Sequence, residues 1–124
     1  MNQVMAIAVG GALGSVLRYW LSTGVHAWLG RGFPYGTLAV NVLGCFVMGL
    51  LFVLLVERFA ESPALRAGLL IGVLGGFTTF SSFSIETFNL IEQGAMAKAA
   101  ANMAASLILC VGATWSGVIL ARQL

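Results

Sequence analysis

Four long apolar stretches, separated by short polar connections, make up almost the whole chain. They run over residues 4–29, 35–56, 64–91 and 98–121, and Arg18 interrupts the first of them. Each exceeds the roughly 20 residues that a helix needs to cross a hydrocarbon core of about 30 Å. The connections leave no room for another domain. The pattern therefore predicts an all-α membrane protein with four transmembrane helices, in a single domain over residues 1–124.

Turn and cap residues mark the ends of these helices. Residues 30–34 contain two glycines and a proline, which predicts a tight turn. Glu57 to Glu61 is expected to be a polar connection, and Ser62 and Pro63, which follow it, are typical of an N-cap and a first helical residue. Gln93 and Gly94 resemble a C-terminal cap.

Composition agrees with a membrane location. The chain is 60% hydrophobic and 8% charged, whereas a soluble domain carries about 25% charged residues. The net charge of +2 is small and scattered, so we expect the lipid bilayer, and no nucleic acid, as a partner.

The charges of the connections barely distinguish the two sides of the membrane. Four spans place both termini and the 57–66 connection on one side, and the 30–34 and 92–98 connections on the other. The first side holds three cations and the second holds two: Arg58, Arg66 and Arg122 against Arg31 and Lys98. Orientation follows this bias. Two interpretations stay open: a weak but sufficient bias, or insertion in both orientations, which permits an antiparallel homodimer.

Glycines recur every four residues in two of the spans. Gly10 and Gly14 form one pair, and Gly68, Gly72 and Gly76 form a longer stripe. Residues four apart share a helix face, so these stripes predict close helix packing. Four short helices enclose little volume, which favours a homo-oligomer for any transport pathway.

Residues 75–84 are the most informative segment, because they place five hydroxyl groups inside the third span. The segment reads Gly-Gly-Phe-Thr-Thr-Phe-Ser-Ser-Phe-Ser. Polar groups at that depth are costly. Its glycines and β-branched threonines lower helix propensity. Either the helix breaks here and frees carbonyls for a hard cation, or it stays intact with hydroxyls bonded to their own i−4 carbonyls.

Other polar and aromatic residues in the spans have two interpretations each. Arg18 either snorkels to the interface or lines a vestibule, where it would gather anions. Asn41 either bonds between helices or donates to an anion. The stripe of Phe77, Phe80 and Phe83 is either packing or a set of ring edges that attract an anion. Glu86, one turn further on, is an ion-pair partner, a proton-linked group or a gate, or it simply faces an aqueous vestibule.

Several kinds of chemistry are not predicted. The two cysteines, Cys45 and Cys110, are expected to be small apolar side chains, and His26 to be structural or solvated. The sequence has no metal-ligand spacing and no nucleophile beside a base, so neither a transition-metal site nor an enzyme is predicted.

Two motifs resemble those of the Fluc (CrcB) fluoride channels. They are the 75–84 segment followed by Glu86, and Gly-Thr-Leu-x-Val-Asn-x-x-Gly at residues 36–44. The resemblance extends from residue 10 almost to the end of the chain. It implies a dual-topology, antiparallel homodimer in the cell inner membrane, with the third helix broken near its centre. The implied function is passive export of fluoride, which lowers cytoplasmic fluoride.

The resemblance also assigns residues. It implies that the backbone carbonyls of Gly75 and Thr78, from both subunits, hold a structural sodium ion at the dimer centre. The positions matching the anion pathway are Phe80, Phe83, Asn41, Ser81, Thr79, Ser106, Arg18, Glu86 and Thr37. Two positions depart from the family pattern: Asn102, where some members have tyrosine, and Cys110, where a hydroxyl sometimes stands.

Two other functions are compatible with four short helices. A small multidrug-resistance-type, proton-coupled transporter needs a membrane-embedded carboxylate, and here only Glu86 can supply one. A non-transporting membrane scaffold explains the glycine stripes but leaves the buried hydroxyls without a purpose.

Overall fold

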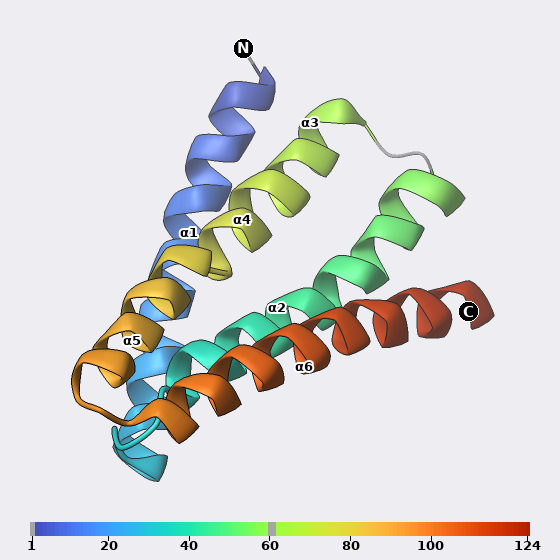
Figure 1. Ribbon diagram of the computed structural model, residues 1–124. Coiled ribbons are helices and arrows are strands. Elements are labelled where there is room, and N and C mark those ends of the chain that lie inside the picture. Colours follow the sequence, from blue (N-terminus) through green and yellow to red (C-terminus); the bar gives the residue numbers. More distant parts are fainter. Residues whose placement is uncertain (1, 60–61) are drawn as a thin grey trace.

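The computed structural model describes residues 2–59 and 62–124. Within these residues the chain is entirely helical apart from short connections (Figure 1). The elements in chain order are α1 (Asn2–Leu29), α2 (Tyr35–Phe52), the π-helical η1 (Val53–Arg58), α3 (Pro63–Arg66), the π-helical η2 (Ala67–Val73), α4 (Leu74–Phe77), α5 (Phe80–Glu92) and α6 (Met96–Gln123).

In the described part of the chain, four helical stretches are long and apolar enough to cross a membrane. They run over Asn2–Leu29, Tyr35–Arg58, Pro63–Glu92 and Met96–Gln123, which confirms the four predicted spans to within a few residues. The polar connection expected from Glu57 onward begins later, because Glu57 and Arg58 belong to η1. The i→i−5 bond from Phe59 N to Leu54 O (3.0 Å) closes that helix. Residues 60 and 61 of the expected connection lie outside the described residues.

The predicted caps are present. Ser62 is the N-cap of α3, where its Oγ accepts from Leu65 N at 3.2 Å, and Pro63 occupies the first helical position. Gly30 and Gly94 adopt φ values of 86° and 79°, the left-handed conformation that favours glycine. Both chain ends lie toward one end of the molecule, opposite the loops that contain these two glycines (Figure 1).

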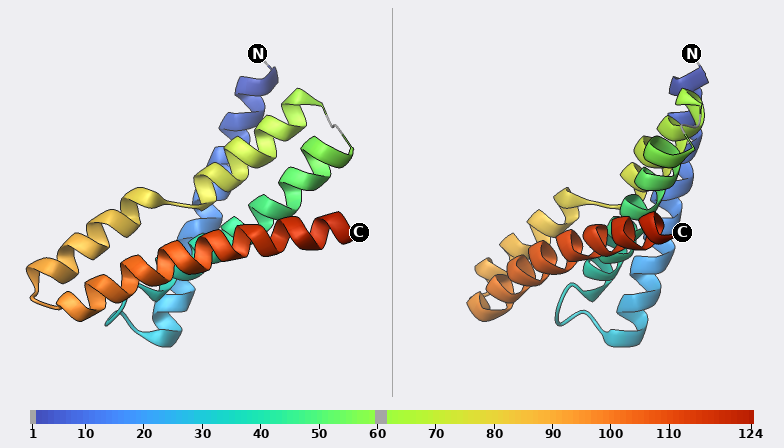
Figure 2. Two further views of the ribbon diagram at one scale, coloured as in Figure 1. Left: turned by 45° about the vertical axis from the view of Figure 1, so that its right-hand side comes forward. Right: turned by 90° about the vertical axis from the view of Figure 1, so that its right-hand side faces the viewer.

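The glycine stripes do pack helices closely, as predicted. A Cβ at Gly10 would overlap the Gly68 carbonyl, and one at Gly14 would overlap the Val73 carbonyl, so α1 lies against η2 and α4. A second close pair joins α2 to α6, where a Cβ at Gly49 would overlap the Thr114 carbonyl. Figure 2 shows the two pairs inclined to one another. Backbones this close gain dispersion contacts over their whole length.

α5 separates from the α1 pair and runs instead beside the first turns of α6 (Figure 2). The change of course falls between α4 and α5. Here Thr78 (φ −81°, ψ 155°) and Thr79 (φ −150°, ψ 121°) are extended. Much of the outer surface is apolar, with Val9 67% and Leu107 69% exposed. A surface of this kind suits contact with lipid or with another apolar protein face.

Candidate functional site

The extended residue Thr79 is held by the side chain of Asn41. The Asn41 Nδ2 donates to the Thr79 carbonyl at 2.9 Å, and the Thr79 N–H donates to Asn41 Oδ1 at 2.8 Å. An extended peptide inside a bilayer has no water to satisfy these two groups. The amide of Asn41 therefore replaces the missing helical partners, and the interhelical role proposed for it is confirmed.

Carbonyls before the extended segment lose their usual helical donors. In an α-helix each carbonyl accepts from the N–H four residues later. The Thr79 N–H that would serve Gly75 goes to Asn41, and the Ser82 N–H that would serve Thr78 goes to Thr79 Oγ1 at 3.1 Å. The Gly76 carbonyl instead accepts from Arg18 Nε at 3.0 Å. This contact holds the Arg18 side chain against the third span, and it was not predicted from the sequence.

A cluster of hydroxyls surrounds the N-terminus of α5. Thr79 caps the helix, and its Oγ1 lies 3.1 Å from Ser82 Oγ and 3.3 Å from Ser81 Oγ. The N-terminus of a helix carries a partial positive charge. Hydroxyl donors and this dipole together favour a negative ion beside Thr79.

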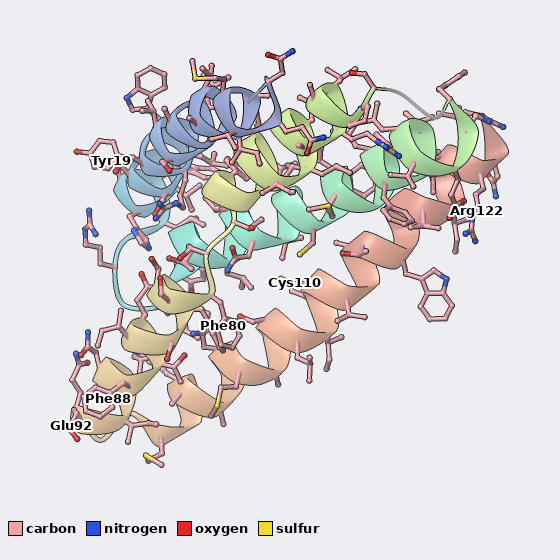
Figure 3. The ribbon with its side chains drawn as sticks, turned by 90° about the horizontal axis from the view of Figure 1, so that it is seen from above. Tyr19, Phe80, Phe88, Glu92, Cys110 and Arg122 are labelled. Atoms are coloured by element: carbon pink, nitrogen blue, oxygen red, sulfur yellow. The ribbon has the colours of Figure 1, made fainter. Side chains whose placement is uncertain are left out.

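A first cavity, of about 500 Å³, lies between α2, α5 and α6. Its lining includes five of the predicted pathway residues: Asn41, Thr79, Phe80, Phe83 and Ser106. The rings of Phe80 and Phe83 are tilted by 45° with their centroids 5.3 Å apart. Phe80 is 80% exposed and points into the space between α5 and α6 (Figure 3). This aromatic pair has unfilled space beside it, so it is not part of a packed core.

A second cavity, of about 280 Å³, lies on the other side of Thr79. It is lined by Arg18, Thr37, Thr79 and Glu86, all predicted, and by five residues that were not: Ser15, Tyr19, Ser22, Thr23 and Ser82. The spacing of Ser15, Arg18 and Ser22 along one helix face is the signal that would have found the serines.

Glu86 has one satisfied and one unsatisfied oxygen. Its Oε2 accepts from Thr37 Oγ1 at 2.9 Å, whereas its buried Oε1 has no hydrogen-bond partner among the described residues. Both Glu86 and Arg18 line the second cavity, so that cavity contains one acidic and one basic group. A buried oxygen without a partner is costly, and native structures keep few of them.

Thr79 is the residue that the two cavities share. Of the predicted pathway residues, Ser81 alone lines neither cavity, although its hydroxyl contacts that of Thr79. The structure thus gathers residues from all four spans around the extended segment.

The two positions that depart from the family pattern have different surroundings. Asn102 is 2% exposed and donates to Thr87 Oγ1 at 2.9 Å, which joins α6 to α5 away from both cavities. Cys110 lines the first cavity together with Met103. His26, expected to be structural or solvated, is structural, because its Nε2 accepts from Gly36 N at 2.9 Å.

The comparisons with known proteins agree with this arrangement. A family model described as "CrcB-like protein, Camphor Resistance (CrcB)" matches residues 5–118. A protein of Geobacter sulfurreducens named "Fluoride-specific ion channel FluC" is 53% identical over 124 residues, which cover 100% of both chains. A protein of the same name from Magnetococcus marinus is 52% identical over 120 residues, 97% of this chain and 98% of that one.

A third relative with this name, from Methylococcus capsulatus, is 51% identical over 121 residues. The match covers 98% of this chain but 53% of that protein, so the present chain spans about half the length of this relative. The resemblance seen in the two central motifs is confirmed, and the chain belongs to the CrcB-like protein family.

Proposed function

We propose that this chain forms a fluoride-selective ion channel, which exports fluoride passively across the cell inner membrane and so lowers cytoplasmic fluoride. The main support is that Thr79 lines both cavities, and that the two cavities together are lined by hydroxyls, an amide, a cation and two phenyl rings. The full-length relatives named as fluoride-specific ion channels support it.

The lining groups suit a small, strongly hydrated anion. Such an ion enters a membrane only if polar groups replace its water in steps, yet bind weakly enough to release it. One N–H of the Asn41 amide donates to Thr79, and this side chain, which lines the first cavity, carries a second N–H that can donate to an anion. The positive edges of Phe80 and Phe83 add weak attraction without a strong hydrogen bond.

The second cavity serves as the vestibule of this pathway. Arg18 supplies a positive charge there, which raises the local concentration of anions. Its contact with the Gly76 carbonyl fixes the guanidinium beside the extended segment. Thr37 donates to Glu86, and so the carboxylate is turned toward a hydroxyl rather than toward the anion.

In this proposal the third span is a helix broken near its centre, at the extended Thr78 and Thr79. The carbonyls of Gly75 and Thr78 fit a hard cation, because the N–H groups that would normally bond them are engaged by Asn41 and by Thr79 itself. Two carbonyls are fewer ligands than a hard cation takes, so a second copy would supply a matching pair. When bound, a structural sodium ion would supply a fixed positive charge at the centre of the dimer.

The assembly proposed is an antiparallel homodimer with dual topology. A charge bias of three cations to two allows insertion in both orientations. The exposed face of Phe80 and the apolar side chains of α6, such as Leu107, offer a surface for the second copy. In a background without native cysteines, a Gln93→Cys variant labelled with an impermeant thiol reagent should react equally from both sides of the membrane. Labelling from one side alone would exclude the dual arrangement.

Growth in fluoride tests the proposed function. A bacterial strain that lacks its own fluoride exporter should regain growth in millimolar fluoride when it expresses this chain. Failure of rescue, with the protein present in the membrane, would contradict the proposal. The comparisons do not favour the multidrug-transporter alternative, and the same strain should gain no resistance to cationic drugs.

A further inference from the structure

Three sulfur-containing side chains line the first cavity. They belong to Cys45 of α2 and to Met103 and Cys110 of α6. Both cysteines are free thiols and half-buried, and both line this one cavity from adjacent helices. Figure 3 shows Cys110 on the part of α6 that faces α2, close to Phe80. The pathway described above makes no use of these thiols.

The backbone around the two thiols is firmly held. Thr114, one turn after Cys110, donates from Oγ1 to the Cys45 carbonyl at 3.1 Å. Further along the same helix pair, a Cβ at Gly49 would overlap the Thr114 carbonyl, and one at Gly117 would overlap the Phe46 carbonyl. The helices are in backbone contact there, so the two thiols are kept together on adjacent helices.

We propose that Cys45 and Cys110 form a binding site for a soft, two-coordinate divalent metal ion of the mercuric type. Thiolates are soft ligands and select soft metals. Zinc requires four ligands, usually nitrogen, oxygen or thiolate, and here two thiols are available. Met103 lines the same cavity about two helical turns before Cys110, so its thioether is not one of the proposed ligands.

Charge also favours a divalent ion over a monovalent one. The cavity wall around the sulfurs is mostly apolar, including Leu107 and Val111. Two thiolates on a mercuric ion make a neutral complex, whereas two thiolates on a silver or cuprous ion keep a net negative charge. An uncompensated charge is costly in apolar surroundings.

The binding step balances without an oxidant. Mercuric chloride is a neutral molecule that enters apolar phases. Two S–H bonds and two Hg–Cl bonds break, and two Hg–S bonds form. Two protons and two chloride ions are released, and the oxidation state of mercury does not change. Metal binding by thiols releases protons in this way because the thiolate is the ligand.

The site can be tested by retention of mercury on the purified protein. Wild type, Cys45→Ser, Cys110→Ser and Met103→Leu would each be loaded with mercuric chloride and washed with an excess of a competing monothiol. We expect wild type to retain one mercury per chain, with an ultraviolet sulfur-to-mercury charge-transfer band and release of two protons. Both single-cysteine variants should lose the metal and the band in the wash, and Met103→Leu should keep both.

Equal retention by wild type and by the single-cysteine variants would overturn the proposal, because it would mean that the thiols bind separately. Loss of mercury from wild type in the wash would overturn it as well. Retention does not depend on transport, so this result stands apart from the fluoride-channel proposal. A second readout rests on that proposal: mercuric chloride should block fluoride flux in wild type. In a Cys45→Ser/Cys110→Ser variant, the fluoride flux after mercuric chloride should equal the flux of the same variant before treatment.

Discussion

Asn41 and Thr79, on different spans, are joined by a pair of hydrogen bonds that runs in both directions, from side-chain amide to backbone carbonyl (2.9 Å) and from backbone N–H to side-chain carbonyl (2.8 Å). The pair works as a peptide group would in a sheet or helix, because it satisfies one donor and one acceptor at once. It therefore allows an extended residue to lie within an otherwise helical membrane span.

Loss of this pair should destabilise the site. In Asn41→Ala, the part-buried Thr79 N–H and carbonyl lose their partners, at a cost of about 1 kcal/mol for each group. Asn41→Asp keeps an acceptor for the N–H but places a carboxylate against the Thr79 carbonyl. We expect both variants to unfold at lower temperature in detergent and to conduct little fluoride.

Asn102→Ala is the matched control for Asn41. It also removes a hydrogen-bonded amide within a span, but one that bonds Thr87 and lines neither cavity. It should lower the unfolding temperature while the flux per folded protein stays near that of wild type. If the Asn41 and Asn102 variants lose flux equally, the special role of the Asn41–Thr79 pair is wrong.

Arg18 should depend on both its charge and its shape. Arg18→Gln removes the cation of the second cavity, and Arg18→Lys keeps the charge but loses the Nε contact with the Gly76 carbonyl. A hydrogen bond from a charged group contributes about 1.5–3 kcal/mol. Fluoride flux should fall most in Arg18→Gln, less in Arg18→Lys, and little in Arg31→Gln, whose side chain is exposed. Wild-type flux in Arg18→Gln would refute the vestibule role.

The two cavity-lining phenyl rings should be required for transport. Phe80→Ile and Phe83→Ile keep apolar bulk but remove the positive ring edge. We expect each to slow fluoride about tenfold or more, which corresponds to about 1.4 kcal/mol on the barrier. Phe88→Ile is the control, since Phe88 lies on the same helix but outside both cavities. Unchanged flux in Phe80→Ile and Phe83→Ile would show that the two rings serve only in packing.

Close helix packing can be tested at two glycines of the same helix. A Cβ at Gly14 would overlap the Val73 carbonyl, whereas one at Gly24 would meet nothing within 4 Å. Gly14→Ala should lower stability by about 1–3 kcal/mol through overpacking. Gly24→Ala should leave it unchanged or raise it slightly, because alanine is the better helix former. Thermal unfolding in detergent would measure both, and equal midpoints would show that the stripe does not set the packing.

Much of the fold could be predicted from local sequence properties. Hydropathy located the four spans, because length and apolarity alone decide whether a helix can cross a membrane. Ser62 and Pro63 marked a helix start by their own chemistry. Low helix propensity at residues 75–79 pointed to the place where the extended threonines lie.

The partners within the site could not be predicted in this way. The bonds of Asn41 with Thr79, of Arg18 with Gly76 and of Thr37 with Glu86 join residues 38, 58 and 49 positions apart. These contacts depend on how the helices cross, which periodicity does not specify. The burial of Asn102 against Thr87 was missed for the same reason.

Ion efflux from liposomes measures fluoride selectivity itself. Purified protein would be reconstituted into vesicles loaded with fluoride or with chloride, and efflux would be followed with an ion-selective electrode after a potassium ionophore is added to dissipate the potential. A fluoride-selective channel should release fluoride rapidly and chloride negligibly. Release of the two ions at equal rates, or of neither, would contradict the proposed function.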